Sequence, residues 1–179
     1  MIATVKVWDP FVRIFHWGLV ASFAIAWLTA DEWDNLHEAV GYIAIGLIGF
    51  RLFWGIVGPH YARFSSFLPR PGVVAGYLGD ILRGQEKRYI GHNPAGAIMI
   101  IALILAMVGT TATGWMNTTE RFWGESWVEE AHEFLASGFL MLVFLHVAGV
   151  IFASMRHCEN LVQSMITGRK RLPSNDDIQ

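Results

Sequence analysis

The stretch from Trp127 to Arg156 most constrains the fold of this chain, because it is a long apolar segment that contains two histidines. It reads WVEEAHEFLASGFLMLVFLHVAGVIFASMR and, as a helix, is long enough to cross a bilayer. His132 and His146 lie 14 residues apart. That spacing is nearly four helical turns and a rise of about 21 Å, so both imidazoles leave one face of the helix. One histidine is therefore expected near each side of a hydrocarbon core about 30 Å thick.

The composition is typical of an integral membrane protein. Hydrophobic residues make up 54% of the 179 residues and charged residues only 16%, whereas about a quarter of a soluble domain is charged. The net charge of −2 gives no basis for binding nucleic acid. The single cysteine, Cys158, excludes an intramolecular disulfide framework and a multi-cysteine metal site. The N-terminal sequence lacks the cleavage site of a signal peptide, so the first apolar segment is expected to stay in the mature protein.

Four apolar segments have about the length of a membrane-spanning helix. Asp9-Pro10 precedes the first and Asn93-Pro94 the third, in each case an N-cap residue followed by a proline that suits the first helical turn. Gly58 ends the second segment. We therefore predict an all-α integral membrane protein, a bundle of four transmembrane helices. The helices are expected at about residues 11–29, 37–57, 94–116 and 127–156.

The remaining chain divides into a long loop and a tail. Within the loop, the apolar residues between Pro71 and Gly84 fall at helical spacing. They predict either a short amphipathic helix lying on the membrane or a solvated loop. We expect one transmembrane four-helix domain over residues 1–168, followed by a polar, disordered tail over residues 169–179.

Basic residues predict the orientation of the helices. Twelve of the thirteen Lys and Arg residues fall on the side that holds both termini and the long loop, and only Arg121 falls on the other. The positive-inside rule then places both termini in the cytoplasm. The opposite side is acidic, with Asp31, Glu32, Asp34, Glu120, Glu125, Glu129 and Glu130.

This topology sorts four histidines into two pairs by depth. His16 lies early in an outward-running helix, and His146 lies in the inner half of an inward-running one. His37 and His132 each lie near the start of an inward-running helix. We therefore expect His37 opposite His132 on the outer side and His16 opposite His146 on the inner side.

Two facing imidazoles are the axial ligands that a six-coordinate haem iron needs. Zinc fits less well, because it takes a tetrahedral set and the two pairs lie too far apart to share an ion. Glycines near the histidines could leave room for a porphyrin or could serve close helix packing. They are Gly18, Gly41, Gly46, Gly49, Gly138 and Gly149.

Three further residues are candidates for contact with haem propionates. Arg51 follows His37 by 14 residues, as His146 follows His132, so it is either a propionate partner or a positive-inside anchor. Arg13 has the same two interpretations. His92 in GHNPAG could reach a propionate or help to cap the third helix.

Several motifs together resemble the bacterial cytochrome b561 family, which is related to the b-type cytochrome subunits of nickel–iron hydrogenases. They are VWDPFVRIFHW with His16, LHEAVGY with His37, GHNPAG with His92, and AHEFLA and LHVAGV with His132 and His146. The resemblance implies a four-helix bundle in the bacterial inner membrane with two b haems, each held by two histidines. Its ligands fall on the four histidines already paired by depth. It also implies electron transfer between a quinone and a partner at the outer face.

Three functions are compatible with these observations. The first is an electron-transfer cytochrome, either stand-alone or a subunit, whose partners are membrane lipid, quinone and a periplasmic c-type cytochrome or hydrogenase-like subunit. A homodimer is left open. The second is a superoxide:quinone oxidoreductase, although the acidic outer side would repel a small anion. The third is a haem-free transporter that uses buried histidines for protons or metal. Two same-face histidines on one span favour the first.

Overall fold

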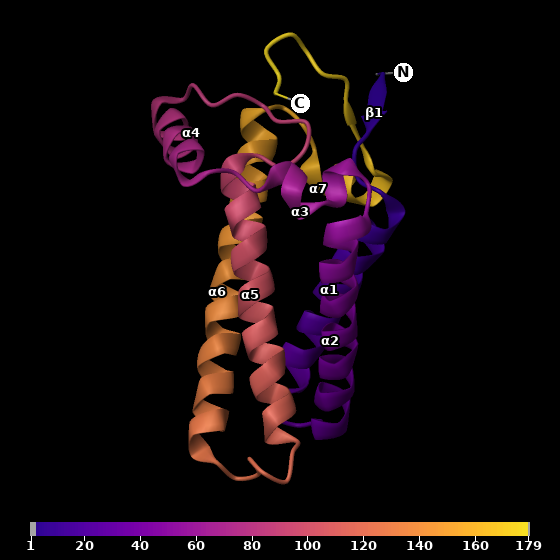
Figure 1. Cartoon of the computed structure of the whole chain (residues 1–179), viewed down its shortest axis with the longest axis vertical. Coiled ribbons are helices and arrows are strands. Elements are labelled where there is room, and N and C mark those ends of the chain that lie inside the picture. The colour runs from indigo at the N-terminus through magenta and orange to yellow at the C-terminus, as the bar shows by residue number, and fades with distance from the viewer. Residues whose placement is uncertain (1–2, 179) are drawn as a thin grey trace. The chain divides into compact units, whose positions relative to one another are not determined.

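The computed structural model describes residues 3–178 and is mainly helical (Figure 1). Within these residues, four helices are long and apolar enough to cross a membrane, and they are the four predicted segments. These are α1 (Pro10–Thr29), α2 (Asp34–Val57), α5 (Pro94–Asn117) and α6 (Ser126–Arg156). The shorter elements are β1 (Thr4–Lys6), η1 (His60–Ala62), α3 (Phe64–Phe67), α4 (Pro71–Arg83), α7 (Leu161–Thr167) and β2 (Arg169–Arg171).

Capping side chains determine where two of the long helices begin. The Asp9 carboxylate accepts hydrogen bonds from the amides of Phe11 and Val12, at 3.0 and 3.2 Å, and so caps α1. The Asn93 side chain accepts one from the amide of Gly96 at 2.7 Å and caps α5. Helix α2 begins three residues earlier than expected, at Asp34, whose negative charge suits the first turn of a helix.

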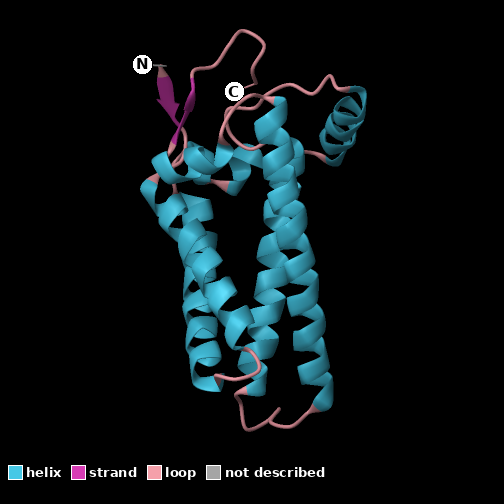
Figure 2. Ribbon diagram, turned by 180° about the vertical axis from the view of Figure 1, so that it is seen from behind, coloured by secondary structure: helices cyan, strands magenta, loops and turns pink. Residues whose placement is uncertain are grey.

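The chain forms two compact units, and each long helix contributes residues to both. The helical unit comprises residues 14–53 and 102–144. Within it, α5 and α6 run side by side in opposite directions (Figures 1 and 2). Its core is formed by Ala44, Ile48, Met107 and Phe139, with Phe23 of α1 packed edge-on against Phe139 at 4.7 Å. All four long helices therefore contribute to one apolar core.

The outer surface of the helical unit is also apolar. Leu28, Leu105 and Phe134 are 81%, 65% and 78% exposed. Many exposed large apolar side chains of this kind would be unfavourable in water, whereas hydrocarbon is a suitable solvent for them. The exposed side chains are thus consistent with spans that face lipid.

The terminal unit comprises residues 3–13, 54–101 and 145–178. Its small core is made by Val7, Trp8 and Ile90. Helix α4 confirms the helical alternative for the loop: its buried Tyr77 packs edge-on against Tyr89 at 5.6 Å, and Gly84 ends it in the left-handed conformation.

Residues 169–178 differ from the expected disordered tail. Strand β2 pairs antiparallel with β1, with Val5 opposite Lys170, and this is the small sheet in Figure 2. Farther along, the Ile178 carbonyl accepts a hydrogen bond from the Ile90 amide, and the Ile178 amide donates to the Arg88 carbonyl, both at 2.9 Å. The polar composition of the tail gave no sign of this docking, because its partners lie far away in the sequence.

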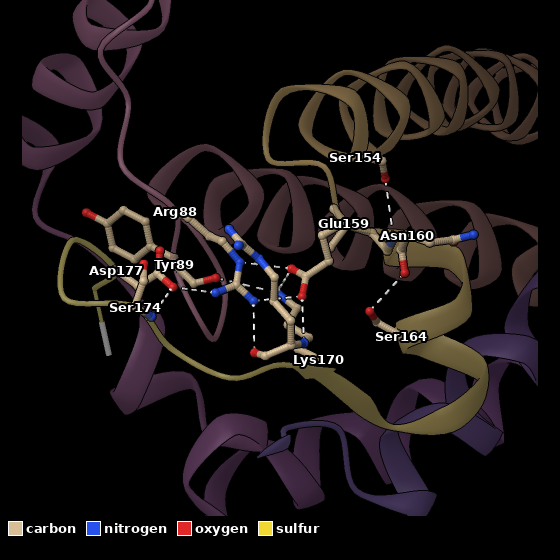
Figure 3. A network of polar contacts seen from close by, with 11 residues as sticks. Arg88, Tyr89, Ser154, Glu159, Asn160, Ser164, Lys170, Ser174 and Asp177 are labelled. Carbon is tan, nitrogen blue, oxygen red and sulfur yellow. Dashed lines mark hydrogen bonds and ion pairs between the residues drawn. The ribbon is translucent and has the colours of Figure 1, made fainter. Parts of the chain in front are cut away.

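A buried ion network holds the same segment (Figure 3). The Arg88 guanidinium donates to Glu159 Oε1 and Oε2 at 2.7 and 3.1 Å and to Asp177 Oδ2 at 2.5 Å. Lys170 lies 4.0 Å from Glu159, and its ammonium is 5.4 Å from the ring centroid of Trp8. The tail is therefore ordered by paired charges, each of which would be costly to bury alone.

Candidate functional site

Two of the predicted histidines face each other inside the helical unit. His37 lies in the first turn of α2, His132 lies near the start of α6, and both are half-buried. Their ring centroids are 6.1 Å apart and their planes meet at 80°. Two imidazoles that bind one metal ion from opposite sides, each with a metal–nitrogen distance of about 2 Å, have centroids about 6 Å apart. The observed separation therefore matches that of two axial ligands.

A backbone carbonyl orients each of the two rings. Nδ1 of His37 lies 2.8 Å from the Ala26 carbonyl oxygen, and Nδ1 of His132 lies 2.9 Å from that of Thr110. A carbonyl only accepts hydrogen bonds, so each Nδ1 carries the proton and donates it. The unprotonated nitrogen of each neutral ring is then Nε2, the atom available to a metal.

Helix α5 supports the His132 ring at two further points. Thr113 Oγ1 lies 3.3 Å from His132 Nδ1, while its hydroxyl can donate to the Gly109 carbonyl at 2.9 Å. A Cβ atom built on Gly114 would lie only 3.0 Å from His132 Cε1. The ring thus occupies space that any larger residue at position 114 would take.

Sequence reasoning did not identify these supporting residues. The segment TTATG, from Thr110 to Gly114, was a signal that could have found them. Hydroxyl and glycine residues clustered within an otherwise apolar span often mark a close, polar helix contact.

Gly41 leaves space beside the His37 ring. Gly41 lies one turn after His37 on the same helix face, and a Cβ atom there would meet no other heavy atom within 4 Å. A Cβ atom would also meet nothing at Gly46, Gly49, Gly138 and Gly149, but these four glycines are exposed and do not bear on the space beside the pair. At Gly18 the Leu47 side chain lies 3.3 Å away. Within residues 3–178 no three His, Cys, Asp or Glu side chains gather as a metal site. Two protein ligands with open space beside them fit a haem better than a bare ion.

The other two histidines belong to different units. His16 lies on α1 in the helical unit, half-buried, with its ring edge-on to Trp17 at 5.1 Å. His146 lies on α6 in the terminal unit and is also half-buried. Their pairing stays a prediction.

The two candidate arginines have different surroundings. Arg51 on α2 is only 4% exposed in the helical unit, so it is no surface anchor. Arg13 is in the terminal unit, where its guanidinium donates to the Ile166 carbonyl at the end of α7. That contact satisfies one of the carbonyls that a helix end leaves open.

The His92 ring packs against two aromatic rings. The Trp8 and Phe67 centroids lie 4.6 and 4.4 Å from its own, all in the terminal unit. The cap of α5 comes from Asn93 rather than from His92. His60 is exposed and His157 half-buried.

Four apolar helices of membrane-spanning length define a helical membrane protein, and the rings of His37 and His132 lie 6.1 Å apart within its helical unit. The sequence pattern of prokaryotic cytochrome b561 matches residues 7–168. The chain belongs to that family.

Curated relatives are similar to the chain at modest identity. A probable Ni/Fe-hydrogenase B-type cytochrome subunit of Azotobacter vinelandii is 28% identical over 156 residues, covering 70% of this chain and 64% of the relative. Proteins with the same description are 21% identical in Rhizobium leguminosarum bv. viciae, covering 97% of this chain and 92% of the relative, and in Rhodobacter capsulatus, covering 93% and 81%. The chain therefore spans less than two thirds of the length of the Azotobacter relative. No solved structure matches it significantly.

Proposed function

We propose that this protein is a dihaem b-type membrane cytochrome that carries electrons across the bacterial inner membrane, between the quinone pool and a redox partner on the periplasmic side. The observation that carries the proposal is the facing pair of His37 and His132, each anchored through Nδ1, in a member of the cytochrome b561 family. A bound haem b would supply one-electron chemistry at its iron.

The protein's part in that chemistry is to hold its ligands ready. Because the carbonyls of Ala26 and Thr110 fix the tautomer and orientation of His37 and His132, little movement is needed when a haem binds. A hydrogen bond from Nδ1 also makes the imidazole a more basic ligand, which favours the oxidised metal. The apolar core and the lipid-facing helices would keep water from the site.

A second haem is assigned to His16 and His146. Support comes from the 14-residue spacing between His132 and His146, which places both on one face of α6. Arg51 is the favoured partner for a propionate, because it is buried and lies 14 residues after His37. Arg13 and His92 are secondary candidates, since Arg13 already donates to α7 and the His92 ring packs at a tilt against the rings of Trp8 and Phe67.

The redox partner is expected at the acidic side of the spans. Both termini are assigned to the cytoplasm because twelve of the thirteen basic residues fall on their side. The relatives described as hydrogenase B-type cytochrome subunits favour a hydrogenase-like partner there, and a basic c-type cytochrome would also be complementary to the acidic residues.

Haem extraction tests the proposal. Acid–acetone should release all haem from the purified membrane protein, because no CxxCH motif is present to attach it covalently. A pyridine-haem assay should then give about two haem b per polypeptide, one for each histidine pair. A ratio near one haem per polypeptide would contradict the second haem site. A protein without any haem would contradict the proposed function as a whole.

A further inference from the structure

Helix α4 carries an apolar stripe that the terminal unit leaves exposed. Leu82 is 90% exposed and Leu78 is 47% exposed. Ala75, which is also exposed, precedes Leu78 by three residues, and Leu82 follows Leu78 by four. Residues at these spacings lie on one side of a helix, so the three side chains form one continuous stripe. Such a stripe is unfavourable in water and indicates a surface that docks on something apolar.

The other sides of α4 have different surroundings. Tyr77 is buried and packs edge-on against Tyr89 at 5.6 Å, so this side anchors the helix to the rest of the terminal unit. Asp80 lies two residues before Leu82 and, at about 100° of rotation per residue, leaves the helix on the side away from the apolar stripe. The helix therefore has a side toward protein, a polar side and an apolar stripe. This pattern is typical of a helix that lies in the plane of a membrane interface.

The C-terminal end of α4 is attached to the end of a membrane-spanning helix. Arg156 is the last residue of α6, and the apolar part of that helix ends just before it, at Met155. The Arg156 guanidinium donates to the carbonyl of Gly84, the residue that ends α4, and to Glu86 Oε1 at 2.7 Å. A basic residue at the end of a span lies at the level of the lipid head groups. Leu82, two residues before Gly84, is therefore held close to the edge of the hydrocarbon.

Exposed basic residues flank the apolar stripe. Arg70 precedes α4, Arg83 is its last residue and Lys87 follows four residues later, and all three are exposed. Two acidic residues lie between positions 70 and 87. The Glu86 side chain is only 1% exposed and is paired with the end of α6, while Asp80 lies 3.9 Å from Arg83. The exposed charge around the stripe is thus mainly positive, which complements the phosphates of an anionic lipid surface.

We propose that α4 docks on the bilayer surface, with Leu78 and Leu82 among the upper acyl chains and with Arg83 and Lys87 against the phosphates of anionic phospholipids. The attachment to Arg156 favours lipid over a second protein, because it brings the stripe to a level where the bilayer is already present. The inference goes beyond the proposed function and does not depend on it, since it uses only the spanning helices and the terminal unit.

The first test measures the depth of position 82 in the bilayer. A nitroxide is attached to Leu82→Cys in the purified full-length protein, in which Cys158→Ser removes the single native thiol. In nanodiscs, power-saturation EPR compares collisions of the label with oxygen, which concentrates in hydrocarbon, and with a water-soluble nickel chelate. Gly76→Cys is the matched control, because Gly76 lies on the same helix, is exposed, and a Cβ atom there meets no other heavy atom within 4 Å.

We expect the label at position 82 to collide mainly with oxygen and the label at position 76 mainly with the nickel chelate. Leu78→Cys should repeat the result for position 82, and circular dichroism identifies variants with the normal helix content. Frequent collisions with the chelate at positions 78 and 82 would overturn the proposal. Protection of these labels from both reagents would overturn it too, because it would show that a protein surface covers the stripe.

The second test identifies the class of lipid. The ratio of docked to undocked α4, taken from the two-component EPR spectrum of the label at position 82, is compared in nanodiscs of phosphatidylcholine with and without phosphatidylglycerol. Phosphatidylglycerol should raise this ratio. Arg83→Gln combined with Lys87→Gln should lower it about tenfold or more in the anionic mixture only, since each basic residue near an anionic surface contributes about fivefold.

Arg121→Gln is the control for the loss of positive charge. Arg121 is exposed and belongs to the helical unit, away from α4 in the sequence. It should leave the docked ratio unchanged in both lipid mixtures. A docked ratio that is the same with and without phosphatidylglycerol, or an equal fall for Arg121→Gln, would overturn the assignment to anionic lipid.

Discussion

The imidazole rings of His37 and His132 face each other with their centroids 6.1 Å apart, and each donates from Nδ1 to a backbone carbonyl of a neighbouring helix. The carbonyls belong to Ala26 on α1 and Thr110 on α5, so all four long helices take part in the arrangement. These hydrogen bonds go to backbone carbonyls and do not depend on the side chains of Ala26 and Thr110. The geometry of the site is therefore set by helix packing as much as by the histidines.

Gly114 should be needed for correct placement of His132. A Cβ atom at this position would lie 3.0 Å from the imidazole Cε1, and the branched side chain of Gly114→Val would displace the ring. We expect the haem assigned to His37 and His132 to be lost or to become high-spin, which reduces low-spin haem by about half. Absorption and EPR spectra of the purified variant would measure this.

Gly46→Val is the matched control for that substitution. Its new side chain begins in open space on α2, since a Cβ atom there meets nothing within 4 Å. It should retain the full haem content. Equal haem loss in both variants would show that the effect comes from general disturbance of the helices and not from the contact with His132.

Thr113 should tune the same site without being essential to it. Thr113→Val removes the oxygen 3.3 Å from His132 Nδ1 but leaves the Thr110 carbonyl at 2.9 Å. With one acceptor fewer, the imidazole becomes a less basic ligand, so the reduction potential of this haem should rise. The rise should not exceed about 40 mV, the equivalent of about 1 kcal/mol for a neutral hydrogen bond.

Potentiometric titration of Thr113→Val beside Thr111→Val would test this assignment. Thr111 lies on the same helix, and its hydroxyl donates to the Met107 carbonyl at 2.8 Å. It should leave the potentials of both haems unchanged. A fall in potential for Thr113→Val, or an equal shift in both variants, would contradict a role through His132.

Much of the helical architecture follows from local sequence signals. Apolar runs of membrane-spanning length predict all four long helices, and the capping residues Asp9 and Asn93 predict two of their starts. Charge counting and helical spacing also suggest that His37 and His132 lie at one depth, and the structure brings them together. The supporting Gly114 was not predicted, because its importance depends on which face of α5 meets α6, and an all-apolar helix surface does not encode that clearly.

Contacts between distant polar residues were harder to predict. Arg88 was counted as one of the basic residues of a cytoplasmic loop, yet it is 5% exposed and pairs with Glu159 and Asp177. Those partners lie 71 and 89 residues away in the sequence, and each is unremarkable in its local context. Polarity alone therefore predicted disorder for residues 169–179, where a buried ion network orders the segment up to Ile178.

Arg88 should be the residue on which the C-terminal segment most depends. Arg88→Met would leave the buried carboxylate of Asp177 without its cation and that of Glu159 with only the more distant Lys170. Breaking a buried pair in this way typically destabilises a fold by about 3–5 kcal/mol. We expect faster proteolysis after β2 and a lower unfolding temperature. Arg83→Met removes an exposed pair with Asp80 at 3.9 Å and should have little effect on either measurement.

The same network predicts release of the tail in acid. Burial raises the pKa of Glu159, but hydrogen bonds from Arg88 and the Arg171 amide outweigh it and hold the pKa below its usual value of 4.5. The pKa of Asp177 is also lowered, chiefly by hydrogen bonds from Ser174 and Arg88 against an opposing effect of burial. Lowered folded-state pKa values give stability that is present above the unfolded values and is lost as the pH falls through the folded ones.

Hydrogen exchange at the Ile90 and Ile178 amides would follow this release. Both amides should be protected near neutral pH and should lose protection below about pH 4. Lys170 titrates in a different pH range. Burial lowers its pKa to about 8, so its contribution to the free energy of unfolding rises with pH between about 8 and 10.5. Protection that increases on acidification would contradict the network as the source of order.

The last prediction concerns the four proposed ligands together. If His37 and His132 hold one haem, His37→Ala and His132→Ala should produce the same lesion, with that haem lost or five-coordinate. His16→Ala and His146→Ala should likewise match each other, with the opposite haem affected. Combining the two substitutions of one pair should add little to either one alone, because residues that act as a unit are not additive.

Potentiometric titrations of variants that insert and accumulate normally would separate these cases, since the two haems should differ in potential. For His37 and His132 the expectation rests on the 6.1 Å separation of the ring centroids in the structure. For His16 and His146 it rests on helical spacing and charge, so this pair is the stricter test of the proposed function. If His146→Ala removes the same haem as His132→Ala, pairing by depth is wrong. The orientation inferred from the basic residues would then have to be reconsidered as well, because both assignments come from the same topology.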